Sequence, residues 1–203
     1  AGKTGGEPLT FADLRKAGIE LQMMTTNLTQ RRPHRLPWSD RVFFFDPHEW
    51  REFFPESVVQ WMIDHPPPSN PDDSDDSDRI RQAMLPRLPF PAADDLPVVV
   101  AARMSLSFPL LISAVPLWSF DRTLKRNNDA LEGRGGKAVP EPVWFSDGGI
   151  ASNFPVHFFD TALPTRPTFA IDLDGFHPDF PKQPDEAKNV YLPSSNVGGL
   201  LER

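Results

Sequence analysis

One acidic side chain in this sequence stands where an apolar strand is expected to end and a pair of glycines begins. Residues 142–146 (Pro-Val-Trp-Phe-Ser) are typical of a strand, and Asp147, Gly148 and Gly149 follow directly. In open α/β sheets, ligands bind at the carboxyl edge of the strands, and glycines let the backbone approach closely. Asp147 is therefore a candidate catalytic carboxylate. An ordinary Asp-Gly turn after a strand would explain the same residues.

The histidines offer weaker patterns. No two of them have the spacing of paired metal ligands, such as His-x-x-x-His, so we expect no metal site. The five are His34, His48, His65, His157 and His177. A Ser-His-Asp triad needs a histidine after the acid, and His157 and His177 both follow Asp147. A conventional triad esterase therefore remains an alternative.

The elements around Asp147 predict an α/β fold. Helices are expected at residues 10–17, 47–54, 56–64 and 103–115, and strands at residues 19–28, 41–45, 96–101, 142–146 and 168–173. Strands that alternate with helices favour a sheet that is at least partly parallel, with helices packed against it. The bulky aromatics between Trp38 and Trp61 are expected to form its core, although they could instead line an acyl-chain pocket.

Three features in this order resemble the patatin-like phospholipase family. They are the run Ala-Arg-x-Ser-x-Ser-x-Pro at residues 102–109, the Asp-Gly-Gly at residues 147–149, and the Asn-x-Pro at residues 153–155. The resemblance covers about residues 9–159 and is loosest over residues 34–93. It implies the C-terminal portion of a patatin-like three-layer α/β domain, and a lipid acyl hydrolase that uses a Ser–Asp dyad.

The resemblance assigns roles to three residues of this chain, but it does not identify the nucleophile. It implies that Asp147 is the catalytic base, that Gly148 and Gly149 support it, and that no cofactor is used. The family's nucleophile lies in a Gly-x-Ser-x-Gly motif, and none of the thirteen serines here has that context. The serine is therefore expected upstream of this chain, in a longer polypeptide or on another chain. The alternative is a non-catalytic patatin-like module for binding or scaffolding.

Charge and composition limit the classes of partner that we expect for this chain. The net charge of the 203 residues is −7, and five aspartates lie within residues 72–78, so the rest of the chain is nearly neutral. This balance gives no reason to expect nucleic acid as a partner. A lipid or acyl-ester substrate is expected, with peripheral membrane contact as a further possibility. The chain has no cysteine and no recognisable signal peptide or membrane span, and we predict a cytoplasmic location.

The chain is expected to form one domain over residues 1–203 with two poorly ordered parts. Residues 66–80 are rich in proline, serine and aspartate and are predicted to be a disordered insert. The EF-hand spacing is not met there, which disfavours a calcium site. A loosely ordered tail is predicted after about residue 176, where the sequence becomes rich in proline, serine and glycine.

Overall fold

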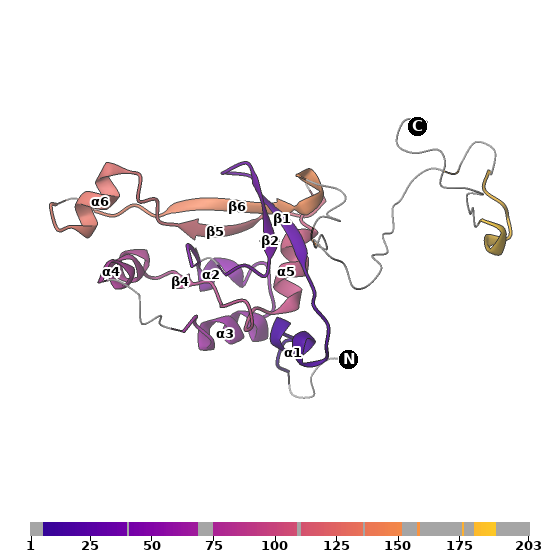
Figure 1. The fold of residues 1–203 in the computed structure, drawn as a ribbon. Coiled ribbons are helices and arrows are strands. Elements are labelled where there is room, and N and C mark those ends of the chain that lie inside the picture. Colours follow the sequence, from indigo (N-terminus) through magenta and orange to yellow (C-terminus); the bar gives the residue numbers. More distant parts are fainter. Residues whose placement is uncertain are drawn as a thin grey trace, which may run out of the picture. The chain divides into compact units, whose positions relative to one another are not determined.

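The computed structural model (Figure 1) describes residues 6–39, 41–68, 75–108, 111–135, 137–151, 158, 176 and 181–189. The chain divides into two units, Ala1–Phe158 and Phe159–Arg203. The described part of the second unit contains a short 3-10 helix, η3 (Glu186–Lys188). Most of the tail predicted after residue 176 lies outside the described residues, as does the strand predicted at residues 168–173.

The first unit contains a six-stranded sheet with the strand order β2-β1-β6-β5-β3-β4. The strands are β1 (Met23–Asn27), β2 (Arg32–Leu36), β3 (Phe43–Phe45), β4 (Leu88–Pro89), β5 (Val115–Ser119) and β6 (Glu141–Asp147). Every pair of neighbours in this sheet is antiparallel. The site strand β6 lies between β1 and β5, in the interior of the sheet.

The antiparallel sheet corrects the predicted fold class. A partly parallel, patatin-like three-layer α/β domain was expected, and the six described strands contain no parallel pair. Parallel neighbours need a long crossover connection, whereas β1 and β2 are joined by a short hairpin. The prediction failed because the order of elements does not fix the direction of pairing: helices separate the successive strands from β3 to β6, and these strands still pair antiparallel.

The apolar run at residues 96–101 needs a second correction. It was predicted as a strand, but it begins the helix α5 (Val98–Ser105), with Pro97 at the N-cap. A short apolar run does not distinguish a buried strand from a buried helix by periodicity. In the helix, Val100, Ala101 and Met104 share one buried face, and Val99 is 47% exposed. The helix predicted at residues 103–115 therefore lies earlier in the chain, and β5 begins at Val115.

Other predicted helices are confirmed. Thr10 forms a capping box with Asp13 at the start of α1 (Phe11–Lys16), and Pro47 begins α2 (Pro47–Trp50). The third, α3 (Glu56–Asp64), has the predicted bounds. A further helix, α6 (Lys125–Leu131), was not predicted. Among the residues that the structure describes, none of the helices has the length and apolar character needed to cross a bilayer.

The aromatic residues predicted as core do form it. Five of them, Trp38, Phe43, Phe45, Trp50 and Phe54, pack into one buried cluster, which also contains Phe90, Phe145, Val100, Met104 and Val143. Trp50 is fully buried, and its indole N–H donates to the Pro116 carbonyl oxygen at 2.8 Å. In Figure 1, α1, α2, α3 and α5 lie on the same side of β5 and β6, and α5 packs against β1 and β6.

The C-terminal part of the predicted acidic insert, residues 75–80, is ordered into a helix. The structure describes α4 (Asp75–Met84) in a segment where disorder was predicted from residue 66 to residue 80. Asp76 pairs with Arg122 at 2.7 Å, and Asp78 pairs with Arg81 at 3.2 Å. Acids in the first turn of a helix also interact favourably with its dipole. Some of the aspartates that suggested a solvated linker thus lie in the first turns of a helix. Residues 69–74 lie outside the described residues.

Candidate functional site

Asp147 ends β6 and caps the 3-10 helix η1 (Gly148–Ile150). It is partly buried, and its Oδ1 accepts the Gly149 N–H at 2.6 Å. Opposite it on β1 lies Thr25. No ion pair to this carboxylate occurs among the residues that the structure describes. One carboxylate oxygen is therefore held by the backbone of η1.

The position of Asp147 depends on the carbonyl oxygen of Ser107, just beyond α5. This oxygen accepts the Asp147 N–H at 3.1 Å and the Ser146 hydroxyl at 2.6 Å. The two segments are 39 residues apart in sequence. The structure thus brings together two of the three sequence features, the helix-end serines and the Asp-Gly-Gly. The third feature, residues 153–155, lies outside the described residues.

The end of α5 and the end of β6 meet at the Ser107 carbonyl oxygen, and we call this place the junction. Thr25 on β1 also contacts the junction, and the sequence analysis did not identify it. Its buried hydroxyl lies 2.7 Å from the Ser146 carbonyl oxygen and 3.2 Å from the Met104 carbonyl oxygen, and it donates toward both. One side chain therefore ties β1 to β6 and to the last turn of α5. A threonine in a strand carries no sequence signal for this role, because the same residue type is common on any half-buried strand.

Gly148 is required by close packing. A Cβ atom built at this position would lie 2.4 Å from the Met24 carbonyl oxygen, closer than real Cβ contacts allow. Because the obstacle is backbone in β1, a larger residue at this position would displace η1 or the strand. The first glycine of the predicted supporting motif is thus explained by its proximity to β1.

The two serines at this junction are occupied structurally. The Ser107 hydroxyl donates to the Arg103 carbonyl oxygen at 2.6 Å, and both Ser107 and Ser146 are buried. The Arg103 guanidinium donates to the hydroxyls of Ser107 at 2.5 Å and Ser113 at 3.0 Å. Partial burial lowers the pKa of Arg103 from its usual value. Neither Ser107 nor Ser146 is placed as a nucleophile for Asp147.

Exposed apolar side chains lie on the chain segments that hold Asp147. We call them the apolar rim: Leu106 (62% exposed), Phe108 (54%), Leu111 (80%), Ile112 (40%) and Ile150 (47%). The first four lie around and after Ser107, whose carbonyl oxygen binds Asp147, and the fifth lies in η1. Grouped apolar side chains on a surface mark sites for apolar ligands or partners. Exposed apolar side chains thus lie on the two chain segments that are hydrogen-bonded to each other at Asp147.

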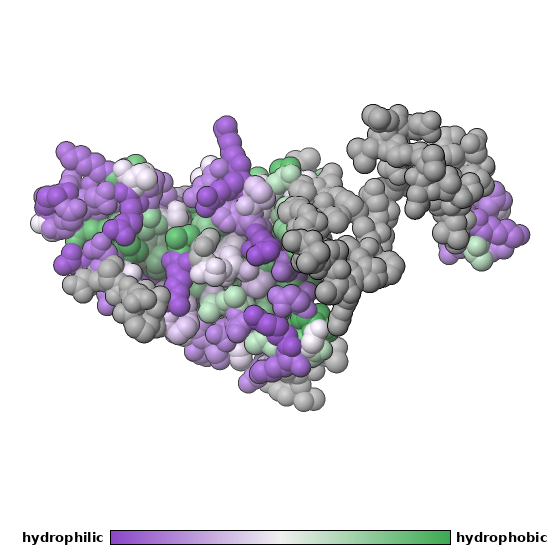
Figure 2. All heavy atoms as spheres, viewed as in Figure 1, coloured by the Kyte–Doolittle hydropathy of each residue, from purple (hydrophilic) through white to green (hydrophobic). Residues whose placement is uncertain are grey.

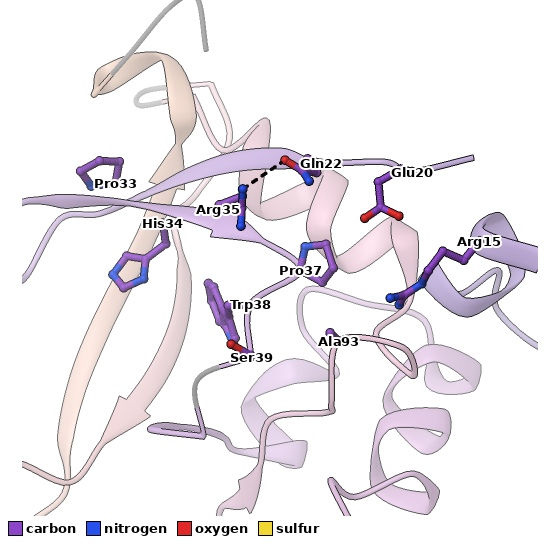
Figure 3. Close-up of a pocket in the computed structure, with 10 residues that line it drawn as sticks. All are labelled: Arg15, Glu20, Gln22, Pro33, His34, Arg35, Pro37, Trp38, Ser39 and Ala93. Atoms are coloured by element: carbon purple, nitrogen blue, oxygen red, sulfur yellow. Dashed lines mark hydrogen bonds between the residues drawn. The ribbon is translucent and has the colours of Figure 1, made fainter. Parts of the chain in front are cut away.

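The described histidines do not join Asp147. His34 lines a separate cleft of about 460 Å³, shown in Figure 3 with Arg35, Gln22 and Trp38. Glu20 and Arg15 also line that cleft, so its walls carry both signs of charge. His65 stacks on Trp61, and His48 is exposed on α2. His157 and His177, the alternatives for a triad, lie outside the described residues.

Comparison with known proteins gives one informative relative. A protein of Rhizobium meliloti (strain 1021), named RpoH suppressor, is 35% identical to this chain over 241 residues. The alignment covers 98% of this chain and 36% of the relative, so the chain spans about a third of that protein's length. No model of a known protein family matches the chain, and no solved structure matches it.

The two neighbouring threonines of β1 give a matched test of the junction. The Thr25 hydroxyl is hydrogen-bonded, whereas the buried Thr26 hydroxyl has no partner in the structure. Thr25→Val should lower the free energy of unfolding by about 1–2 kcal/mol, because two buried carbonyl oxygens lose a donor. Thr26→Val should leave it unchanged or raise it slightly, since an unpaired polar atom is removed. Urea unfolding of both variants measures the difference. Equal losses would contradict the junction described here.

Proposed function

We propose that this chain supplies the catalytic carboxylate of a lipid acyl hydrolase. In this proposal Asp147 is the general base of a Ser–Asp dyad, and the nucleophilic serine comes from outside these 203 residues. No cofactor takes part. The observation that supports it most is the placement of Asp147 at the end of an interior strand, half-buried and held by the Gly149 N–H, beside an apolar rim.

The reaction needs four proton transfers through one carboxylate, two in each half-reaction. Asp147 takes the proton of the serine hydroxyl as the serine oxygen attacks the ester carbonyl carbon. The protonated Asp147 then gives that proton to the leaving alkoxide, and an acyl-serine remains. Next, Asp147 takes a proton from water, whose oxygen attacks the acyl-serine and releases the fatty acid. The serine oxygen recovers the proton, and backbone N–H groups of another segment stabilise the oxyanion in both steps.

The local contacts suit a base that works without an orienting histidine. The Ser107 carbonyl oxygen and the Gly149 N–H hold the backbone and the carboxylate of Asp147 at fixed points. A carboxylate positioned in this way has lost much of its freedom before substrate binds, which favours catalysis. The apolar rim would bind the acyl chain, because burying its side chains against hydrocarbon removes apolar surface from water.

The serine would lie in sequence that this chain does not contain. The RpoH suppressor of Rhizobium meliloti is longer than this chain, which spans 36% of it. We propose that the corresponding additional sequence of this protein carries the serine and the oxyanion loop. The proposed location is cytoplasmic. The alternative is a non-catalytic module for binding or scaffolding, in which Asp147 is only a turn residue.

Replacing Asp147 tests the proposed base directly. In the full-length protein, Asp147→Asn should lower kcat for ester hydrolysis by about a thousandfold, because the amide cannot accept the serine proton. Asp64→Asn, at an exposed site on α3, is the matched control and should keep full activity. Activity is measured with a soluble fatty-acid ester, and thermal unfolding verifies that both variants fold. Full activity of Asp147→Asn would exclude this residue as the base.

The apolar rim leads to a second prediction, which concerns the length of the acyl chain that the enzyme prefers. Leu111→Ser should lower kcat/KM for a long-chain ester by roughly fivefold, because one apolar contact with the chain is lost, and should leave a two-carbon acyl ester unaffected. Leu85→Ser removes a leucine of similar exposure near the C-terminal end of α4 and serves as control. If both variants, or neither, changed the preference for long chains, the rim would not be the acyl-binding surface.

A further inference from the structure

The hairpin between β1 and β2 presents a fixed turn to the solvent. Residues 28–31 form the loop, and Asn27 and Arg32 are the last paired residues below it. The Asn27 side chain holds the loop, because its Oδ1 accepts the Gln30 N–H at 3.0 Å and its Nδ2 donates to Gln30 Oε1 at 3.2 Å. Arg31 has a positive φ of 56° and completes the turn. The hydrophilic projection at the top of Figure 2 lies over this hairpin.

This hairpin is basic in an acidic protein. Arg31, Arg32 and Arg35 are exposed, and residues 21–39 contain no aspartate or glutamate, although the chain carries a net charge of −7. The Arg32 side chain donates to the His34 ring, and the Arg35 side chain donates to the Gln22 amide oxygen, so neither of these hydrogen bonds is made to a carboxylate. The Arg35 guanidinium also lies over the Phe158 ring. Glu20 lines the same cleft as Arg35, so the positive charge that attracts an anionic partner is carried mainly by Arg31 and Arg32.

Two exposed apolar side chains lie beside these arginines. Leu28 is 40% exposed and Trp144 is 43% exposed. They are neighbours, because the Leu28 N–H donates to the Trp144 carbonyl oxygen at 2.8 Å and the Trp144 N–H donates to the Thr29 hydroxyl at 3.1 Å. Tryptophan is favoured at membrane–water interfaces, where its ring enters the apolar region and its N–H stays hydrated. The hairpin thus combines apolar anchors with cations.

We infer that this surface, which we call the basic hairpin, docks on an anionic lipid bilayer. The inference rests on the proposed function, since a lipid hydrolase must reach its substrate in a membrane. Trp144 and Asp147 are three residues apart on β6, about 10 Å along the strand. Arginines would contact lipid phosphates while Leu28 and Trp144 enter the interface. Docking would therefore place the proposed base close to the bilayer surface.

A bilayer fits these residues better than RNA does. Binding to nucleic acid draws on many phosphate contacts, and a patch of three arginines on a chain of net charge −7 offers few. An anionic bilayer has a negative surface potential. A few cationic side chains are therefore enough for binding when apolar side chains also insert into the bilayer. The pairing of Leu28 with Trp144 at the same loop supplies that apolar part.

Vesicles of ether-linked lipids test the inference apart from catalysis. The full-length protein should sediment with vesicles that contain phosphatidylglycerol and not with phosphatidylcholine alone, and added salt should weaken this binding. Ether lipids have no ester bond to cleave, so this binding does not depend on whether Asp147 is a base. Arg31→Glu with Arg32→Glu should weaken the binding by about thirtyfold or more.

Matched variants decide between specific docking and general charge. Lys125→Glu with Lys137→Glu makes the same charge change at exposed sites around α6 and should cost far less binding. Trp144→Ala should weaken binding even at high salt, because the apolar contribution is not screened. Circular dichroism verifies that all variants fold. The inference would be overturned by equal losses in the two charge variants, by equal binding to both vesicle types, by no vesicle binding, or by a preference for single-stranded RNA over vesicles.

Discussion

The carbonyl oxygen of Ser107 is the contact on which the candidate site depends. It receives the Asp147 N–H and the Ser146 hydroxyl, so the end of α5 and the end of β6 are fixed to each other across 39 residues of sequence. Thr25 extends the junction to β1. Because a buried carbonyl left without a donor is costly, each of these bonds constrains the others. The position of the Asp147 backbone thus follows from contacts of three separate elements, and the Gly149 N–H holds its carboxylate.

Local signals in the sequence predicted the parts of the site better than the sheet around it. The strand ending at Asp147 and the capping box of Thr10 depend on neighbouring residues, and both are present. The direction of strand pairing could not be predicted from the order of elements, because helices separate the strands from β3 to β6 and these strands still pair antiparallel. Thr25 could not be predicted, because its role comes from a pairing register with β6 that only the folded sheet defines.

Three surfaces meet along β6 and its neighbours, and each has different chemistry. The carboxylate of Asp147 is polar and partly buried, the apolar rim beside it includes Ile150, and the basic hairpin borders Trp144. The antiparallel sheet does not weaken this argument, since function is argued from the site and not from the fold.

The central claim is that Asp147 works with a serine from outside these residues. The most direct measurement is the intact mass of the full-length protein before and after a fluorophosphonate, which esterifies activated serines, followed by mapping of the labelled peptide. The account predicts a single adduct on a serine outside this chain, and no adduct in the variant that lacks the Asp147 carboxylate. An unlabelled protein, or an adduct on a serine within this chain, would contradict it.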